Sequence, residues 1–256
     1  MPDEPAPPTD PADATVLLAP AKLTLSLRVT GVRDDGYHLI DAEMVTLDLC
    51  DELHVEPTDG PSTLAIDAGP AGAAVAADAD NLVLRALAAV DRRAHVRLVK
   101  RIPPGAGLGG GSADAAAVLR WAGCADLAVA ARLGADVPFC VVGGRARVRG
   151  IGEIVDPLPA RDQVLTLLTP PFGCSTPAVY AAWDALGGPN AQFGGNDLEP
   201  AALVVEPRLA RYRDRLGDAT GQVPRLAGSG STWFVEGAFP GPGRIVTRTA
   251  PAPPSP

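Results

Sequence analysis

The stretch Pro-Pro-Gly-Ala-Gly-Leu-Gly-Gly-Gly-Ser-Ala, residues 103–113, is the most informative part of this chain because it holds five glycines within seven positions. An alternating apolar segment, residues 95–102, precedes it, and a strong helix former, residues 112–121, follows it. A strand, a glycine loop and a helix in this order point backbone N–H groups and a helix dipole at an anion. A Cβ in the loop would block the close approach of a phosphate. The stretch therefore predicts a phosphate cradle, with Ser112 or Asp114 available to cap the helix.

Two well-known phosphate loops fit less well. A P-loop requires a lysine directly after its glycines, and this chain has none there. Gly105, Gly107 and Gly110 satisfy the dinucleotide pattern Gly-x-Gly-x-x-Gly, but any glycine-dense run does so by chance. The predicted elements mix strands and helices without strict βαβ alternation, which favours an α+β fold in two lobes. A surface loop without a ligand stays an alternative, against which the flanking strand and helix argue.

Composition narrows the class of protein. The 256 residues carry a net charge of −8 and no basic run, so we expect neither nucleic acid nor an anionic membrane as a partner. The widely spaced cysteines, Cys50, Cys124, Cys140 and Cys174, are typical of buried free thiols in a reducing compartment. No apolar run reaches the length of a membrane span, and residues 1–13 resemble neither a signal peptide nor an anchor. These features predict a cytoplasmic protein and leave its oligomeric state open.

The chain divides by texture into two domains between two tails. We expect tails without fixed structure at residues 1–13 and 250–256, a first domain at 14–157 with the glycine loop, and a second at 158–249. The predicted strands are 16–29 (with a break at Pro20), 44–49, 52–56, 62–66, 96–102, 137–142, 145–149, 164–168, 233–236 and 244–247. The predicted helices are 82–92 (capped by Asn81), 112–121, 125–133, 177–186, 198–204 and 207–216.

Three further places carry groups that could act beside a phosphate. Lys22 lies among small and apolar residues, and Asp136 lies between a predicted helix end and an apolar strand. Tyr37 and His38 follow a predicted turn. Each has a structural alternative, because a lysine can extend along a rim, Asp-x-Pro is often a turn, and an aromatic pair can cover a core edge. Taken singly, these residues decide nothing.

Together with the glycine loop they resemble the GHMP kinase superfamily. The resemblance rests on the ordered segments Pro-Ala-Lys (20–22), Asp-Gly-Tyr-His (35–38), Lys-Arg-Ile-Pro-Pro-Gly-Ala-Gly-Leu-Gly-Gly-Gly-Ser (100–112), Gly-Ala-Asp-Val-Pro (134–138), Asn-Asp-Leu-Glu (196–199) and Gly-Ser-Gly (228–230). It implies a ribosomal-S5-like N-terminal lobe and an abbreviated ferredoxin-like C-terminal lobe. It also implies ATP and Mg²⁺ as cofactors, with Ser112 as a candidate Mg²⁺ ligand. The residues it assigns to ATP are Asn81, Lys100, Pro103, Pro104, Gly105, Ala106, Gly107, Leu108, Gly109, Gly110, Gly111, Ser112 and Ala113.

The spacing from Pro-Ala-Lys to Asp-Gly-Tyr-His resembles the branch of this superfamily that phosphorylates a cytidine-diphosphate-linked sugar alcohol of the non-mevalonate isoprenoid pathway. By that resemblance Asp136 would accept or orient the proton of a tertiary C2 hydroxyl, and Lys22 would offset charge on the transferred phosphoryl group. Tyr37 and His38 would hold the cytosine, with Tyr180 on the opposite face of the base. The residues it assigns to the substrate are Thr24, Tyr37, His38, Tyr180, Gly228 and Ser229.

The chain departs from the family pattern at three points. Thr24 stands where the family usually has asparagine, the region before Gly134 is several residues shorter than usual, and residues 237–243 form a loop where a helix would lie. Two alternatives follow: another GHMP small-molecule kinase, or a catalytically weak nucleotide-binding relative. Tyr37 and His38 argue against the first, and the presence of Lys22 and Asp136 argues against the second.

Overall fold

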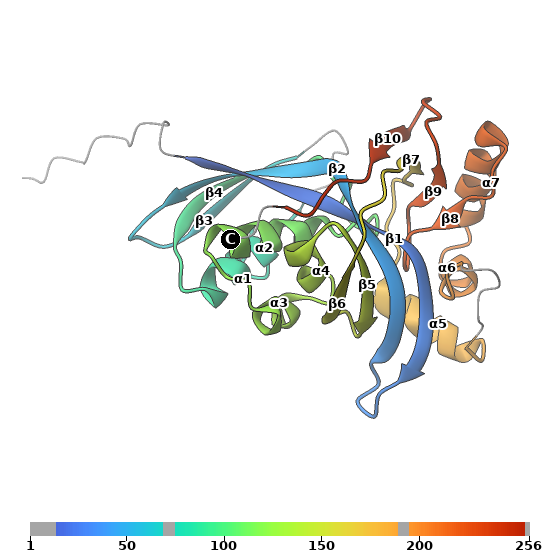
Figure 1. The fold of residues 1–256 in the computed structure, drawn as a ribbon, viewed down its shortest axis with the longest axis horizontal. Helices are drawn as coiled ribbons and strands as arrows, with labels where there is room; N and C mark the ends of the chain where they lie inside the picture. Colours follow the sequence, from blue (N-terminus) through green and yellow to red (C-terminus); the bar gives the residue numbers. More distant parts are fainter. Residues whose placement is uncertain (1–13, 69–74, 189–194, 254–256) are drawn as a thin grey trace, which may run out of the picture.

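The computed structural model describes residues 14–68, 75–188 and 195–253, whose strands form two separate sheets (Figure 1). The first sheet contains β1 to β6 and the second contains β7 to β10. Helices α1 to α4 lie together along the first sheet, and α5 to α7 lie beside the second. One sheet ends with β6 (Ile154–Leu158) and the other begins with β7 (Val164–Leu168), on either side of the expected domain boundary.

Two long antiparallel strands, β1 (Thr15–Val32) and β2 (His38–Pro57), carry the first sheet. The other edge of β2 is shared, with β5 (Arg145–Gly150) along its first part and β4 (Ala94–Val99) along its last. Strand β3 (Thr63–Asp67) extends the sheet beside β4, and β6 extends it beside β5. The strands predicted at 44–49 and 52–56 are thus one strand, because β1 pairs across both.

The chain near the C-terminus fills part of the gap that β5 and β4 leave on the edge of β2. The N–H of Ala250 donates to the carbonyl of Thr46 at 2.8 Å, and Thr249 bridges Leu47. Pro253 and Ala252 lie against Gly143 and Gly144. Residues 250–253 were expected to belong to a tail without structure, but this pairing with an open strand edge fixes them. Residues 1–13 and 254–256 lie outside the described residues.

Four helices cover one face of the first sheet: α1 (Leu82–Ala89), α2 (Gly110–Trp121), α3 (Leu127–Leu133) and α4 (Val137–Val142). Helix α2 is central, since it contacts β1, α1 and α4. Its residues from Ala113 to Leu119 are all buried, which explains why they are small or apolar almost throughout.

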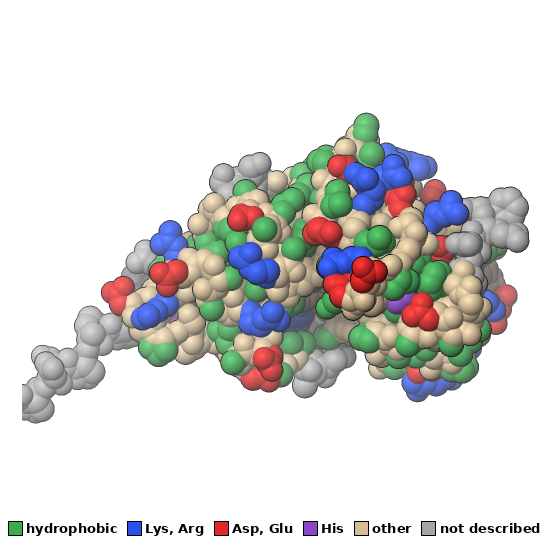
Figure 2. All heavy atoms as spheres, turned by 90° about the horizontal axis from the view of Figure 1, so that it is seen from below, with side chains coloured by type: hydrophobic (Ala, Val, Ile, Leu, Met, Phe, Trp, Pro, Cys, Tyr) green, Lys and Arg blue, Asp and Glu red, His purple; other side chains and the backbone are tan. Residues whose placement is uncertain are grey.

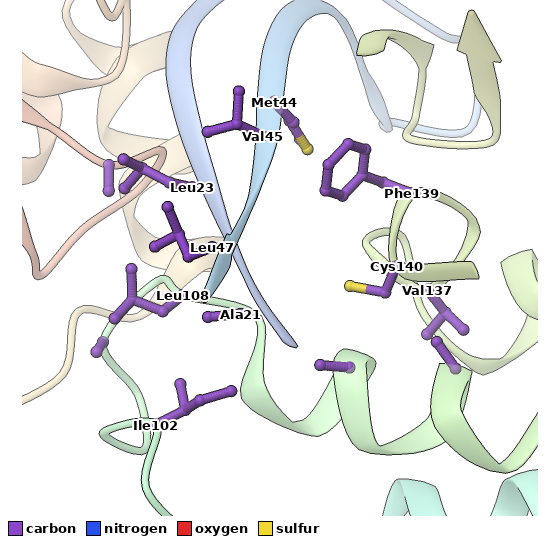
Figure 3. Close-up of a cluster of buried hydrophobic side chains, with 14 of the residues drawn as sticks. Ala21, Leu23, Met44, Val45, Leu47, Ile102, Leu108, Val137, Phe139 and Cys140 are labelled. Atoms are coloured by element: carbon purple, nitrogen blue, oxygen red, sulfur yellow. The ribbon is translucent and has the colours of Figure 1, made fainter. Parts of the chain in front are cut away.

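One apolar core holds the glycine loop against the sheet (Figure 3). Leu23 of β1 and Leu47 of β2 point toward Leu108 and Ile102, which belong to the segment around the loop, and Phe139 of α4 closes the other side. All five side chains are essentially buried. Full burial of a side chain of this size contributes roughly 1.5–3 kcal/mol, so the apolar residues at the loop hold its backbone in place.

The second sheet has four strands in the order β10 (Arg244–Arg248), β7, β9 (Trp233–Glu236) and β8 (Arg225–Leu226). Its helices are α5 (Thr176–Ala185), α6 (Glu199–Val205) and α7 (Leu209–Thr220). The segment 237–243 contains no helix, as the sequence predicts. This lobe is therefore the smaller of the two.

Asn196 and Asp197 join the two lobes just before α6. The buried amide of Asn196 donates to the carbonyls of Leu226 and Gly228 at 3.0 and 2.6 Å. The carboxylate of Asp197 accepts from the N–H of Val29 in β1 at 2.9 Å. The side-chain bonds of Asn196 lie within the second lobe, whereas the bond of Asp197 and the backbone bridge between Asn196 and Leu27 cross to β1. Because both side chains are almost fully buried, these contacts together fix how the second lobe sits on β1.

Two predictions of local structure were wrong. Residues 137–142 form helix α4 instead of a strand, with Asp136 as N-cap and Pro138 in the first turn. A short continuous apolar run carries no periodicity that distinguishes a helix from a strand. Strand β1 is also continuous at Pro20, because a shift in register between Pro20 and Lys22 accommodates the proline.

The remaining predictions concern membranes and thiols. Among the described residues no helix is long and apolar enough to cross a bilayer. All four cysteines are free, as expected, but only Cys140 is buried, and the other three are partly exposed. Figure 2 shows acidic and basic side chains interspersed over one face, without an extended basic patch among the described residues.

Candidate active site

The glycine loop leads from β4 into helix α2. Gly105, Gly107 and Gly109 have φ values between +67° and +77°, which favour glycine. Gly109 is the N-cap of α2 and makes no side-chain capping bond. Ser112 or Asp114 was expected to cap this helix, but the helix begins two residues before Ser112, so both lie inside it. The first turn therefore has N–H groups that no side-chain cap engages, as an anion site requires.

A cavity of about 580 Å³, here called the glycine-loop cavity, lies against this loop. The residues assigned to ATP that line it are Asn81, Lys100, Pro103, Pro104, Gly105, Ala106, Gly107, Leu108, Gly109, Gly110, Gly111 and Ser112. Ala113 is the exception, because its side chain is buried within α2. Asn81 also caps α1, as predicted, by accepting from the N–H of Val83 at 3.0 Å.

Lys100 is held beneath the loop by two buried carboxylates. Its ammonium donates to Asp51 and, at 2.9 Å, to Asp114. The other oxygen of Asp51 accepts from the N–H groups of Arg101 and Ile102, where the chain leaves β4. Burial alone would lower the pKa of Lys100, but the two carboxylates raise it. Lys100 is therefore bound by carboxylates inside the protein, and these bonds hold the glycine loop and α2 in place.

Within this group of charges, Asp114 is the carboxylate whose pKa is raised. Burial raises its pKa to about 7; the Lys100 charge opposes this rise, and the Asp51 charge adds to it. One oxygen of Asp114 is buried without a hydrogen-bond partner among the described residues. One ammonium cannot neutralise two buried carboxylates, so Asp114 takes up a proton near neutral pH.

Lys22 and Asp136 meet at the other side of the loop. Lys22 Nζ lies 3.3 Å from Asp136 Oδ2 and donates to Thr24 Oγ1 at 3.3 Å. The backbone N–H of Lys22 donates to the carbonyl of Leu108 at 3.0 Å, which ties β1 to the glycine loop. A Cβ on Gly109 would lie 2.7 Å from the Lys22 stem, so the loop and the lysine fit closely together.

The local fold explains how a charged pair comes to lie there. Lys22 is buried in β1, next to the register shift at Pro20. Asp136 stands at the start of α4 but makes no side-chain capping bond, which leaves its carboxylate to the lysine. Its side chain is about one third exposed, whereas that of Lys22 is 7% exposed. The pair thus presents one accessible oxygen acceptor beside a nearly buried ammonium.

A larger cavity of about 900 Å³ begins at this pair. The residues of the sequence prediction that line it are Lys22, Thr24, Tyr37, His38, Ser112, Asp136, Tyr180, Gly228 and Ser229. Gly107 and Ser112 line both cavities. The structure therefore brings the predicted catalytic and substrate residues into one space, and that space adjoins the phosphate cradle at two residues of the glycine-rich segment.

Aromatic residues from both lobes also line the larger cavity. The rings of His38 and Tyr180 lie 4.6 Å apart and are tilted by 30°, so Tyr180 stacks on His38 in this structure. Burial, with a contribution from Asp136, raises the pKa of Tyr180 to about 12, so its hydroxyl stays protonated. Tyr37 is 60% exposed and lies in the turn between β1 and β2. Its ring is therefore accessible to a ligand.

The second glycine loop, residues 228–232, lines the larger cavity and contacts the first glycine loop. A Cβ on Gly107 would lie 2.5 Å from the carbonyl of Gly230, so the two glycine loops touch backbone to backbone. The hydroxyls of Ser229 and Thr176 are hydrogen-bonded at 2.8 Å. Gly228 lies near Thr24. These contacts place the C-terminal lobe directly over the phosphate cradle.

Sequence reasoning missed four charged residues of the site. Asp51 and Asp114 hold Lys100, Asp184 contacts His38, and Arg132 of α3 lines the larger cavity. No local motif marks Asp51, which lies 49 positions from its lysine. Asp114 had a detectable signal, since it is an acid followed by small and apolar residues in a predicted helix.

Comparison with known proteins identifies the family. The description "GHMP kinases N terminal domain" matches residues 81–144. A 4-diphosphocytidyl-2-C-methyl-D-erythritol kinase of Paracoccus denitrificans is 43% identical over 84% of this chain and 84% of its own. One of the same name from Ruegeria pomeroyi is 41% identical over 91% of this chain and 92% of its own. This chain belongs to the 4-diphosphocytidyl-2-C-methyl-D-erythritol kinase family.

Solved structures agree with this assignment. The crystal structure of a 4-(cytidine 5'-diphospho)-2C-methyl-D-erythritol kinase superposes with a TM-score of 0.71 at 32% identity, and covers 92% of this chain and all of that one. A homoserine kinase from Cytophaga hutchinsonii shares only the fold, with a TM-score of 0.60 at 17% identity. The α+β, two-lobed GHMP kinase fold and the ATP-dependent kinase class that the sequence predicts are confirmed.

Proposed function

We propose that this protein transfers the γ-phosphoryl group of ATP to the C2 hydroxyl of 4-diphosphocytidyl-2-C-methyl-D-erythritol, a step of the non-mevalonate isoprenoid pathway. The observation that supports this most directly is the position of the pair Lys22 and Asp136. The pair lies in the larger cavity, which shares Gly107 and Ser112 with the glycine-loop cavity. A nucleotide in one cavity and an alcohol in the other would thus meet at the pair.

The glycine-loop cavity would hold the nucleotide through its backbone. The N–H groups at Gly109 to Gly111 and the positive end of the α2 dipole suit the β- and γ-phosphates. Mg²⁺ held near Ser112 would supply positive charge that offsets the charge of the phosphates. Ser112 fits this role, because its hydroxyl stands in the first turn of α2 where both cavities meet, and Mg²⁺ in kinases takes few protein ligands.

The chemical step needs one proton acceptor and one positive charge. Asp136 would orient the C2 hydroxyl and take its proton while the new O–P bond forms and the bond from the γ-phosphorus to the β,γ-bridging oxygen breaks. Lys22 would offset the charge on the phosphoryl group in transit, and ADP would leave. Thr24, which accepts from Lys22, would fix the direction of the ammonium. In this way a hydroxyl replaces the amide usual in the family.

The rest of the larger cavity suits a cytidine diphosphate. Tyr37, His38 and Tyr180 offer ring faces and polar edges for a base. Arg132 adds a second positive charge that suits the diphosphate. Gly228 and Ser229 of the second glycine loop bring backbone close to the middle of the substrate. We assign the base to Tyr37, His38 and Tyr180, because Lys22 and Asp136 would serve the phosphoryl transfer.

A coupled assay of ADP release tests this function. The purified protein would be supplied with ATP, Mg²⁺ and, in turn, the diphosphocytidyl substrate, homoserine or mevalonate. We expect kcat/KM for the first to exceed the others by on the order of 10² or more, because only it fills both ends of the cavity. Faster turnover of homoserine or mevalonate would identify another GHMP kinase. ATP binding without turnover of any of the three would identify a nucleotide-binding relative.

A further inference from the structure

His38 is paired with an acid from the other lobe. Its Nε2 lies 2.8 Å from Oδ1 of Asp184, which stands 146 positions later in α5. The side chain of His38 is 10% exposed and that of Asp184 is 51% exposed. Both residues line the larger cavity, as do the aromatic side chains of Tyr37 and Tyr180. The acid therefore reaches from the rim of the cavity to a ring that is almost buried.

The His38 ring is held on three sides. Tyr180 stacks against its face at 4.6 Å, and Trp183 meets it edge-on at 5.7 Å and 86°. Asp184 holds Nε2. All three partners come from α5, whose bounds are Thr176–Ala185. A ring fixed by two aromatic contacts and a hydrogen bond keeps one orientation, so the chemistry of its other nitrogen has a defined direction.

A carboxylate can only accept a hydrogen bond, so it selects the tautomer of a neutral histidine. When Asp184 accepts from Nε2–H, Nδ1 has no proton and becomes an acceptor. Among the described residues, no protein donor is found for Nδ1. The structure therefore leaves one acceptor on the ring of His38 for a ligand in the larger cavity.

We propose that Asp184 is a positioning residue that fixes this tautomer, so that His38 Nδ1 accepts from the exocyclic amine of cytosine. This inference rests on the proposed function. Uracil has a carbonyl oxygen in place of that amine, which would set acceptor against acceptor and leave both unpaired. Asp184 would thereby determine the preference for cytidine over uridine although it does not touch the base.

A purely structural role for the pair makes a different prediction. A hydrogen bond with one half-exposed partner contributes little to stability and nothing to the choice of base. Loss of a merely structural contact would thus weaken both substrates equally. Selection of a tautomer changes the ratio between them. The ratio of kcat/KM for the cytidine substrate to that for its uridine analogue therefore separates the two roles.

The test measures this ratio in the wild type, in Asp184→Asn and in the matched control Asp218→Asn, which removes an exposed charge from α7. An asparagine can accept from or donate to Nε2, so it no longer selects one tautomer. We expect a wild-type ratio of on the order of 10² or more. We expect Asp184→Asn to lower the ratio about tenfold or more, through KM more than kcat, and Asp218→Asn to preserve it.

Nitrogen-15 NMR of the histidine rings gives a second readout on the wild type itself, which keeps the test valid if the variant folds poorly. The expected result is a protonated Nε2 and an unprotonated Nδ1 for His38. A protonated Nδ1 in the neutral ring, or an unchanged ratio in a folded Asp184→Asn protein, would overturn the inference. Neither result would affect the proposed function, which fails only if the cytidine substrate is not phosphorylated.

Discussion

Lys22 and Asp136 are the residues that we propose to act together in the phosphoryl transfer. The carboxylate would receive the hydroxyl proton, and the ammonium, 3.3 Å away, would face the transferred phosphoryl group. Asp136→Asn and Lys22→Ala should each lower kcat by roughly 10²–10⁴, because either change removes a group that acts in the transition state. Affinity for ATP should change far less, since the cradle consists of backbone.

Steady-state kinetics and nucleotide titration of the two variants check this prediction. Asp162→Asn is the matched control, because it removes an exposed carboxylate remote from both cavities and should leave turnover unchanged. Retention of more than about a tenth of wild-type turnover in either variant would remove that residue from the mechanism.

Asp114 should make the free energy of unfolding depend on pH. Its pKa is about 7 in the folded protein, chiefly through burial, whereas an aspartate of an unfolded chain titrates near 4. Between about pH 4 and pH 7 the folded protein holds a proton that the unfolded chain has released. The free energy of unfolding should therefore fall as pH rises through this window, by at most about 1.4 kcal/mol per pH unit from this group.

Asp114→Asn removes that proton and leaves Lys100 paired with Asp51 alone. Denaturation at several pH values from 5 to 8 should show the variant gaining stability relative to the wild type as pH rises. The exposed Asp162→Asn serves again as the control for removal of a charge. Parallel curves for the wild type and Asp114→Asn would mean that Asp114 titrates normally.

Among the structural elements, the glycine loop should determine nucleotide binding. Gly109→Val would place a branched side chain at φ +67° and against the stem of Lys22, so it should abolish binding of a non-hydrolysable ATP analogue in calorimetry. Gly110→Val should act similarly, since a Cβ there lies 3.1 Å from Lys100 Nζ. Gly111→Ala is the matched control, because its Cβ meets only Leu82, at 3.5 Å. Unchanged affinity in both valine variants would make the loop purely structural.

Most elements could be predicted from the chain because their patterns are local. The glycine run and its flanking strand and helix are a signal of this kind. Helix α4 (Val137–Val142) could not be predicted as a helix, because it is a run of six apolar residues without an amphipathic period. The order of residues 250–253 was equally invisible, since it depends on the free edge of β2 near Thr46.

Some residues of the candidate site could likewise be predicted from the sequence, and others could not. Lys22, Asp136 and the glycine loop stand in segments with recognisable spacing, and the structure brings them together. Asp51 and Asp184 have no such context, and only the paired sheet and the packing of α5 bring them to Lys100 and His38. Residues that would act through another side chain are therefore positioned by long-range contacts, which the sequence alone does not reveal.

At the scale of the whole molecule, the larger cavity depends on how the two lobes are joined. Asn196 bonds the carbonyls of Leu226 and Gly228 from a buried position, and Gly228 lines that cavity. Asn196→Ala should lower the free energy of unfolding by about 1–3 kcal/mol per unpaired buried carbonyl, and should raise KM for the alcohol substrate.

Chemical denaturation with parallel kinetics measures both effects of Asn196→Ala. Gln222→Ala is its control, because that side chain makes a comparable bond to the carbonyl of Glu236 at an exposed position. A loss of stability no larger than that of the control would show that the joint between the lobes is not fixed by Asn196.

The central claim is that one phosphoryl group passes from a nucleotide at the glycine loop to a hydroxyl beside Lys22 and Asp136. Phosphorus-31 NMR of a reaction with ATP, Mg²⁺ and 4-diphosphocytidyl-2-C-methyl-D-erythritol tests it most directly. The expected result is one new phosphate monoester on C2 for each ADP formed, with the diphosphate bridge of the substrate intact, and at least about a hundredfold less product from Asp136→Asn in the same time. Release of inorganic phosphate without a monoester, or an equal yield from Asp136→Asn, would contradict it.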